Sequence, residues 1–158
     1  YVTGVQTCAL PICSICFFHS RASAATNFEG KKKIVYNEQS LERLKGLIER
    51  YQKVAKIPLL VAIDAEWGLA MRIENTPQYP YAITLGALQD NLALIQEVGR
   101  AIGLDCREAG IHWNLAPVVD INNNPENPVI GYRSFGDDNR WCFKKQRPLW
   151  MAWRVAEP

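Results

Sequence analysis

Two short, unbroken apolar segments, each followed closely by an aspartate, set the strongest limit on how this 158-residue chain can fold. Residues 59–63 read LLVAI and lead into Asp64, and residues 111–118 read IHWNLAPV and are followed by Asp120. A continuous apolar run of this length is typical of a strand buried on both faces, as in a parallel sheet. Residues 15–18 (ICFF) predict one earlier strand of the same kind.

Amphipathic helices are predicted to separate these strands. Apolar residues recur at three- and four-residue steps over residues 38–55, with Asn37 as the expected N-cap. A proline-bearing loop is expected next, and then a second helix over residues 88–109 that ends at Gly110. This alternation of helix and strand predicts an α/β fold made of βα units around a parallel sheet.

Composition and patterning exclude several classes of protein and partner. With 48% hydrophobic and 22% charged residues, the chain has the composition of one ordinary globular domain. No run of 18 apolar residues is present, so no membrane span is expected. Phosphate-binding glycine patterns are absent, and basic clusters with aromatic residues occur only near the two ends, so neither nucleotide nor nucleic acid is an expected partner. The C-x4-C-x2-C spacing of Cys8, Cys13 and Cys16 has no further ligands behind it, and no metal site is predicted.

The polar residues at the predicted strand ends allow competing interpretations. Ligands of α/β proteins bind at the carboxyl ends of parallel strands, so Asp64 and Asp120 could form a glycosidase carboxylate pair, or could simply cap loops. The DINNN sequence that starts at Asp120 does not complete a calcium loop, and turn chemistry is the better interpretation. We expect His112 to be a core residue rather than a base, while Trp67 fits a sugar-stacking platform and simple packing equally well.

Both ends of the chain look foreign to the middle. Residues 2–12 read VTGVQTCALPI, which matches the translation of a common short-read sequencing adapter, and we expect residues 1–13 to be such an artefact. Residues 141–158 hold three of the five tryptophans and Pro148, which should break any helix there. With suitable codons, a two-base shift would turn KKQRPLWMAWRVAEP into KATAFMDGMESGRA, a plausible amphipathic helix, so we expect residues 141–158 to be a frameshifted tail.

Two motifs in the middle of the chain carry a family resemblance. Residues 63–73 (IDAEWGLAMRI) and 116–138 (APVVDINNNPENPVIGYRSFGDD) resemble the N-terminal catalytic domain of glycoside hydrolase family 3. The likeness covers residues 34–139, with the LGAL…GRAIGLDCREAGI helix between the motifs. It implies a (β/α)8 TIM barrel, of which residues 14–140 would supply about strands 2–4 of eight with their helices.

The resemblance also implies which residues contact substrate. Asp64 matches the aspartate that binds hydroxyls of the sugar, and Arg133 and Arg72 match arginines of the sugar site. For each residue a structural role remains as the alternative: a loop cap for Asp64, a structural salt bridge for Arg133 and a solvated charge for Arg72. Trp67 replaces the glycine found in many members of the family, which leaves the sugar open.

The implied activity is that of a retaining exo-glycosidase acting on terminal β-linked sugars. β-N-acetylglucosaminidase activity is favoured, and β-glucosidase activity is the alternative. No residue here matches the catalytic nucleophile or the acid/base, so we expect the fragment to be inactive by itself. Because three strands of a barrel leave open edges and an uncovered apolar face, we also expect it to fold poorly. No metal or organic cofactor is expected. A non-catalytic carbohydrate-binding remnant and a structural barrel without a sugar role are the other two interpretations.

Overall fold

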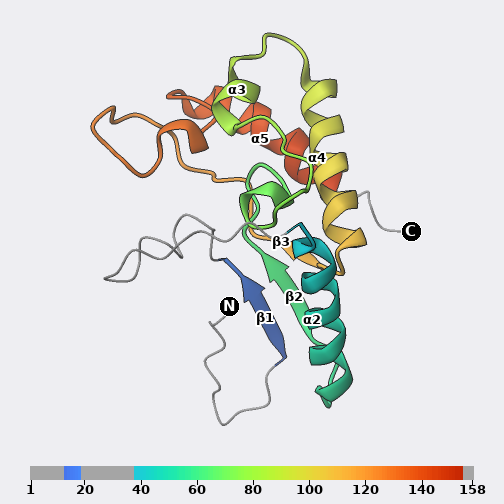
Figure 1. Cartoon of the computed structure of the whole chain (residues 1–158). Helices are drawn as coiled ribbons and strands as arrows, with labels where there is room; N and C mark the ends of the chain where they lie inside the picture. The colour runs from blue at the N-terminus through green and yellow to red at the C-terminus, as the bar shows by residue number, and fades with distance from the viewer. Residues whose placement is uncertain (1–12, 19–37, 155–158) are drawn as a thin grey trace.

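A computed structural model of the chain describes residues 13–18 and 38–154 (Figure 1). Three strands form one parallel sheet in the order β1-β2-β3: β1 is Ser14–Phe17, β2 is Leu60–Ile63 and β3 is Trp113–Asn114. The predicted α/β class with a parallel sheet is therefore confirmed. The predicted strand over residues 111–118 is much shorter in the structure, whereas the other two lie within one residue of their predicted positions.

Strand β2 is the middle strand and has hydrogen-bonded neighbours on both sides. Its first residue, Leu60, pairs with Ser14 of β1, and its third, Ala62, pairs with Trp113 of β3. Just before β3, His112 bonds to Val61 twice: its N–H donates to the Val61 carbonyl (2.9 Å) and its Nδ1 accepts the Val61 N–H (3.0 Å). The side chain of His112 is exposed, so the prediction of a core histidine is wrong. Its ring therefore accepts a backbone hydrogen bond at the edge of the sheet.

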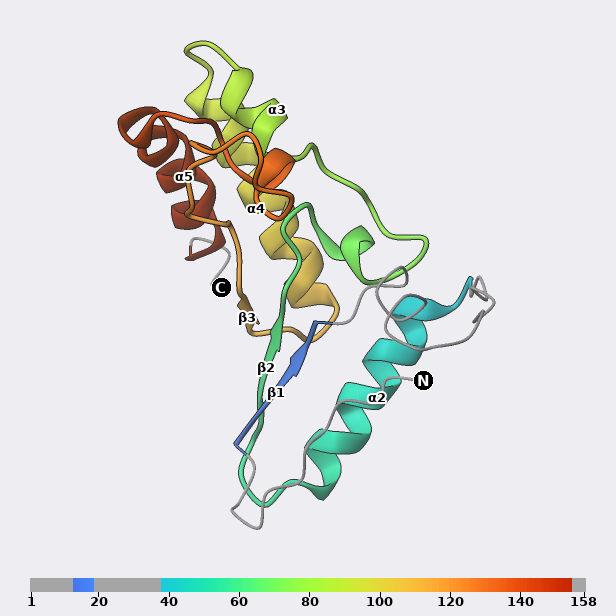
Figure 2. The same ribbon diagram turned by 90° about the vertical axis from the view of Figure 1, so that its left-hand side faces the viewer.

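One face of the sheet is covered by two long helices, α2 (Ser40–Val54) and α4 (Leu92–Glu108). Figure 2 shows the two helices and the strands that they cover. Val61 and Ile63 of β2 are fully buried. They belong to one apolar core with side chains of β1, α2 and α4, among them Phe17, Leu44, Ile48, Ile102 and Cys106. Alternate residues of a strand point to opposite faces, so Leu60 and Trp113 lie on the other face, where they are 41% and 56% exposed.

The helix boundaries differ from the predicted ones at two places. Helix α2 begins at Ser40, with Gln39 in the cap position, rather than at residue 38 after Asn37, which lies outside the described residues. The helix predicted over residues 88–109 is α4, which begins at Leu92 rather than at residue 88, and the short helix α3 (Ala82–Ala87) before it was not predicted. Asp90 has a positive φ of 50°, which a helix cannot include, and Asn91 then caps α4 by accepting the N–H of Leu94.

Helix α5 (Asn139–Arg154) runs through Pro148 and packs beside α4, so the prediction that this proline breaks the helix is wrong. Tertiary packing can hold a helix together against an unfavourable local residue. Leu149, next to the proline, is 1% exposed, and its backbone lies against Gly99 of α4: a Cβ at that glycine would come within 2.5 Å of the Leu149 carbonyl oxygen. The close contact between α4 and α5 therefore outweighs the missing proline N–H.

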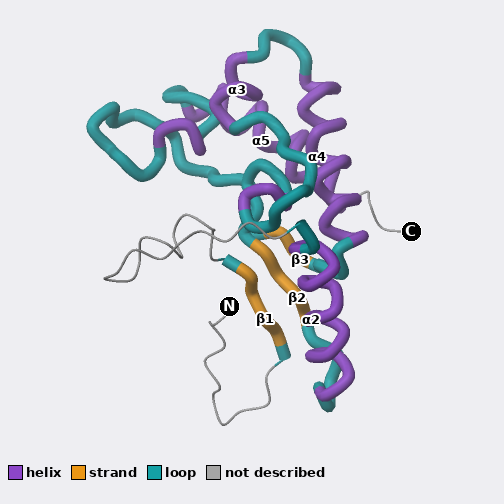
Figure 3. Tube along the Cα trace, viewed as in Figure 1, coloured by secondary structure: helices purple, strands orange, loops and turns teal. Residues whose placement is uncertain are grey.

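The long connection from β3 to α5 is mostly irregular and contains one short helix, η2 (Gly131–Arg133) (Figure 3). Gly110 ends α4 with a φ of 80°, as predicted. The predicted adapter segment lies outside the described residues except for its last residue, Cys13. Among the described helices, none has both the length and the apolar character that a membrane crossing requires.

Two glycines allow a test of how tightly the second motif packs. A Cβ on Gly86 of α3 would overlap the backbone carbonyl of Phe135, whereas a Cβ on Gly46 of α2 would meet nothing within 4 Å. We expect Gly86→Ala to lower the free energy of unfolding by about 2 kcal/mol or more, because backbone has to move. Gly46→Ala, the control, should raise it by about 0.5–1 kcal/mol. Urea denaturation measures both, and equal effects would contradict this packing.

Candidate functional site

Asp64 lies at the carboxyl end of β2, where the sheet holds it from both sides. Its N–H donates to the carbonyl of Phe17 in β1 (3.1 Å). The next residue, Ala65, is bound by the side chain of Asn114 in β3: the Ala65 N–H donates to Oδ1 (3.1 Å) and Nδ2 donates to the Ala65 carbonyl (3.0 Å). The start of the loop after β2 is thereby fixed in place.

Arg72 closes this loop back onto Asp64. From the end of η1 (Leu69–Met71), its Nε donates to the Asp64 carbonyl (2.6 Å) and its Nη2 donates to Oδ2 of the Asp64 carboxylate (2.7 Å). The Arg72 side chain is only 8% exposed and that of Asp64 is 30% exposed. The alternative that Arg72 is a solvated surface charge is therefore wrong, because the guanidinium is buried against the aspartate.

Arg133 forms the second ion pair of the site, with Glu66. Its Nε contacts both carboxylate oxygens of Glu66 (2.9 and 3.1 Å), and its Nη2 lies 2.7 Å from Oε1. Its Nη1 donates to the carbonyl of Val129 (3.2 Å). The Glu66 side chain is 5% exposed and that of Arg133 is 29% exposed. The structure thus supports the structural salt bridge that was the alternative for Arg133, without making it the only role available.

The two ion pairs belong to one electrostatic environment. The hydrogen bond that Arg133 donates to Glu66 is the largest cause that raises the pKa of Arg133, and the charge of Asp64 adds to it. The Arg133 guanidinium has five N–H donors. Its contacts with Glu66 and with the Val129 carbonyl engage three of them, so two remain for a ligand. Arg72 occupies Oδ2 of Asp64, and Oδ1 has no hydrogen bond from another described residue. A carboxylate acceptor beside guanidinium donors suits a ligand with several hydroxyl groups.

Asp120, the other predicted strand-end carboxylate, is not brought to Asp64 by any described contact. Its side chain is exposed, and its backbone carbonyl accepts a hydrogen bond from the hydroxyl of Ser134 (2.8 Å). The sequence that follows forms side-chain turns, since Oδ1 of Asn124 accepts the N–H of Glu126 (3.1 Å). The interpretation of DINNN as turn chemistry is therefore confirmed.

Two residues that hold the site together were not predicted to do so. Glu66 lies 67 positions before Arg133, and Asn114 lies 49 positions after Ala65. Glu66 stands within the first quoted motif, which is the one signal that could have found it. Asn114 gives no such signal, because an asparagine at the end of an apolar run is ordinary turn chemistry.

The cysteines and the acidic residues of the described part of the chain offer no metal centre. Cys13, Cys16, Cys106 and Cys142 are free thiols, and no group of three or more candidate metal ligands occurs among residues 13–18 and 38–154. Burial raises the pKa of Cys106 to about 12, which keeps this thiol protonated and unreactive.

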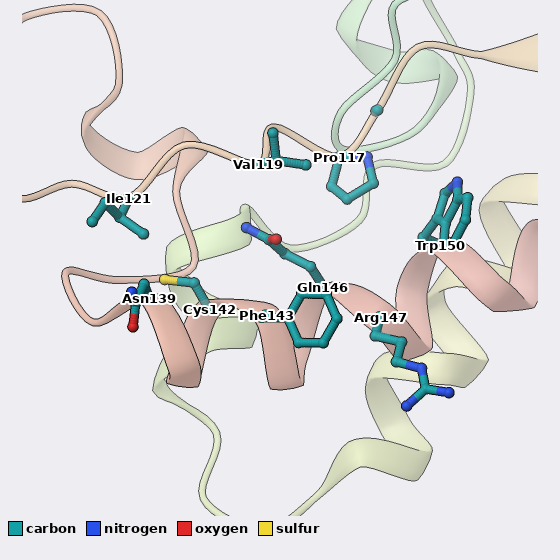
Figure 4. A pocket seen from close by; sticks show the side chains of 10 residues that line it. Pro117, Val119, Ile121, Asn139, Cys142, Phe143, Gln146, Arg147 and Trp150 are labelled. Atoms are coloured by element: carbon teal, nitrogen blue, oxygen red, sulfur yellow. The ribbon is translucent and has the colours of Figure 1, made fainter.

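An apolar pocket of about 550 Å³ lies apart from the two ion pairs. It lies between the segment that follows β3 and one side of α5 (Figure 4). Its lining includes Pro117, Val119, Ile121, Cys142, Phe143 and Trp150. We call the two ion pairs, Asp64–Arg72 and Glu66–Arg133, the strand-end site. None of these four residues lines the pocket, so the pocket and the strand-end site are separate.

Comparison with known proteins identifies one family. The sequence model of the glycosyl hydrolase family 3 N-terminal domain matches residues 21–144. Over 91 residues the chain is 38% identical to β-hexosaminidase A of Pseudoalteromonas piscicida. Over 87 residues it is 31% identical to a β-N-acetylglucosaminidase/β-glucosidase of Cellulomonas fimi. Each match covers 55% of this chain and 15% of the relative, so the chain spans a small part of the curated relatives that it matches.

A solved structure supports the same family assignment. The chain is similar to a glycoside hydrolase family 3 β-N-acetylglucosaminidase from Paenibacillus sp. str. FPU-7, with 28% identity and a TM-score of 0.65. The similarity covers 89% of this chain and 25% of that chain. Nearly all of the described fold therefore has a counterpart in one segment of a larger enzyme.

The pair between Glu66 and Arg133 can be tested by removing the carboxylate. Glu66→Ala should lower the free energy of unfolding by about 1–2 kcal/mol, because it leaves the partly buried guanidinium of Arg133 without its carboxylate partner. Glu42→Ala, the control, removes an exposed carboxylate 3.8 Å from Lys45 and should change this free energy by less than about 0.5 kcal/mol. Urea denaturation compares the two. Similar losses would show that the Glu66–Arg133 pair contributes no more than a surface pair.

Proposed function

Because this chain belongs to glycosyl hydrolase family 3, we propose that it forms the sugar-binding part of a retaining exo-glycosidase that releases terminal β-linked sugars. The observation that carries the proposal is the arrangement of Asp64, Arg72 and Arg133 at the carboxyl end of β2. Ligands of parallel α/β folds bind at this end of the strands. Asp64 is a fixed carboxylate beside two guanidinium groups, and its Oδ1 accepts no hydrogen bond from another of the described residues. Such a group is suited to a pyranose ring and its hydroxyls.

In the proposed mechanism, the residues of this chain bind and orient the sugar. Asp64 accepts hydrogen bonds from sugar hydroxyls through Oδ1, while Arg72 holds the carboxylate in its orientation through Oδ2. Arg133, anchored by Glu66, donates its remaining N–H groups to the same sugar. Charge-assisted bonds of this kind are short and depend strongly on geometry, so they discriminate between sugars by the position of each hydroxyl.

The favoured sugar is β-linked N-acetylglucosamine, with glucose as the alternative. Support comes from the β-hexosaminidase of Pseudoalteromonas and from the Paenibacillus structure, whose name is that of a β-N-acetylglucosaminidase. The Cellulomonas relative carries both activities in its name, which keeps β-glucosides as the second candidate.

We place the reacting groups outside these 158 residues. The three strands would be about strands 2–4 of an eight-stranded barrel, and the family's aspartate nucleophile and its acid/base belong to parts that this chain does not match. The exposed Leu60 and Trp113 on the uncovered sheet face fit this interpretation, because a closed barrel fills its interior with side chains. The 158-residue chain alone should therefore hydrolyse nothing, and a remnant that only binds carbohydrate is the alternative.

The activity is tested on the full-length protein that contains this segment. It should hydrolyse p-nitrophenyl β-N-acetylglucosaminide faster than the β-glucoside, and Asp64→Asn should lower kcat/KM by about 100-fold, because a charge-assisted acceptor is lost. Asp120→Asn, the matched control at the other predicted strand end, should stay within about twofold. Absence of hydrolysis, combined with binding of N-acetylglucosamine, would favour the carbohydrate-binding remnant.

We also propose that residues 141–158 are read out of frame. In α5, Lys145 is fully buried, with its Nζ 4.3 Å from the ring centre of Trp141 and bonded to the Leu88 carbonyl, while Phe143 is 66% exposed. A buried lysine beside an exposed phenylalanine is the reverse of ordinary helix patterning. Resequencing the source DNA should give KATAFMDGMESGRA in place of KKQRPLWMAWRVAEP, and an adapter sequence at residues 2–12. A DNA sequence that encodes the present residues would contradict the proposal.

A further inference from the structure

Three aromatic side chains from separate segments gather beside the strand-end site. Trp67 lies in the loop after β2, Tyr81 immediately precedes α3, and Tyr132 lies in η2. The ring centroids of Trp67 and Tyr81 are 4.9 Å apart in an edge-to-face arrangement. Those of Tyr81 and Tyr132 are 4.8 Å apart, and those of Trp67 and Tyr132 are 6.0 Å apart. Each ring contacts the other two, and we call these three residues the aromatic cluster.

The chain joins the aromatic cluster directly to the Glu66–Arg133 ion pair. Trp67 follows Glu66 and Tyr132 precedes Arg133, so the pair and two of the rings share the same two segments. The Tyr132 hydroxyl lies close enough to Arg133 to help raise its pKa. The carbonyl of Trp67 accepts the N–H of Tyr79 (3.1 Å), which brings the segment that carries Tyr81 against the same loop.

The exposure of the rings separates this cluster from a buried core. Tyr132 is 52% exposed and Tyr81 is 37% exposed, and both exceed the exposure of the Arg133 side chain beside them. Binding sites for small molecules combine aromatic surface with a few fixed polar groups, and here the two lie side by side. The exposed aromatic surface of Tyr81 and Tyr132, next to the Glu66–Arg133 pair, is therefore available to the apolar face of a second sugar ring.

We propose that Trp67, Tyr81 and Tyr132 form the subsite for the leaving-group sugar, stacking against the pyranose ring next to the one held by Asp64 and Arg133. The inference rests on the proposed function, because an exo-acting enzyme binds only one sugar on the non-reducing side of the bond it cleaves. Any second ring at this site therefore belongs to the leaving group. The occupant is the reducing-end sugar of a β-linked disaccharide, and Trp67 acts as part of a stacking platform as well as in packing.

The test compares two substrates of the full-length protein that share the bound sugar and differ in the leaving group. One is the β-linked disaccharide of N-acetylglucosamine, and the other is N-acetyl-β-glucosaminyl fluoride, whose leaving group has no ring. Tyr132→Leu and Trp67→Leu should each lower kcat/KM for the disaccharide about three- to tenfold, the effect expected from losing one aromatic contact. For the fluoride, kcat/KM should stay within about twofold.

Two further variants separate stacking from folding and from the hydroxyl group. Tyr132→Phe keeps the ring and should lower the disaccharide kcat/KM less than Tyr132→Leu does. Tyr51→Leu changes a tyrosine of α2, away from the aromatic cluster. It should change kcat/KM for neither substrate. A fall in kcat/KM that is equal for both substrates would show that the rings only support the loop, and would overturn the subsite. Unchanged values in the leucine variants would overturn it as well.

The proposed function fails in a different way. If the unsubstituted protein hydrolyses neither the disaccharide nor the fluoride, the glycosidase activity is wrong and the subsite is overturned with it. If it hydrolyses both and the leucine variants behave like the unsubstituted protein, the glycosidase activity stands and only the subsite is wrong.

Discussion

The two-sided pairing of β2 is the constraint on which the rest of the structure depends. Val61 and Ile63 are fully buried against the helices, and hydrogen bonds to β1 and β3 leave this strand little freedom to shift. A parallel strand held in this way places its next residue, Asp64, at the carboxyl edge of the sheet, where the bond to Phe17 continues the pairing. A one-residue slip would turn alternate side chains to the other face and would remove the buried residues from the core. The position of the candidate site is therefore set by the same burial that stabilises the sheet.

Charge balance at the site bears on the kind of ligand it can take. The loop after β2 contributes two carboxylates, Asp64 and Glu66, and each is matched by one arginine. The four charges sum to zero, so this group of charges does not by itself favour an anionic ligand. A neutral ligand would be recognised through the direction of individual donors and acceptors. The charge balance is therefore compatible with the neutral pyranose that is proposed as the ligand.

The elements that could be predicted from the sequence are those fixed by local pattern. The apolar runs located β1 and β2, and the helical periodicity located α2 and the main part of α4, because burial of a face leaves a repeating trace in the sequence. The pairing of Glu66 with Arg133 leaves no such trace, since it joins residues 67 positions apart. The exposure of His112 and the continuity of α5 through Pro148 also depend on neighbours that are distant in the sequence. Local pattern therefore predicted the scaffold, and the family resemblance supplied Asp64, Arg72 and Arg133 as candidate site residues, a role that stays a prediction.

The contacts that order the site are short-range in space and largely independent of a closed sheet. Arg72 and Asn114 fix the loop after β2 from within the three strands and their connections, and Glu66 fixes Arg133. The opposite face of the sheet, with Leu60 and Trp113 exposed, contributes nothing to these contacts. In the proposed function, recognition of the sugar belongs to this part of the fold and the reacting groups belong to another. The contacts that position Asp64 and Arg133 come from β1, β2, β3 and the segments that follow them. The proposed catalysis would bring the bound sugar together with groups outside these segments.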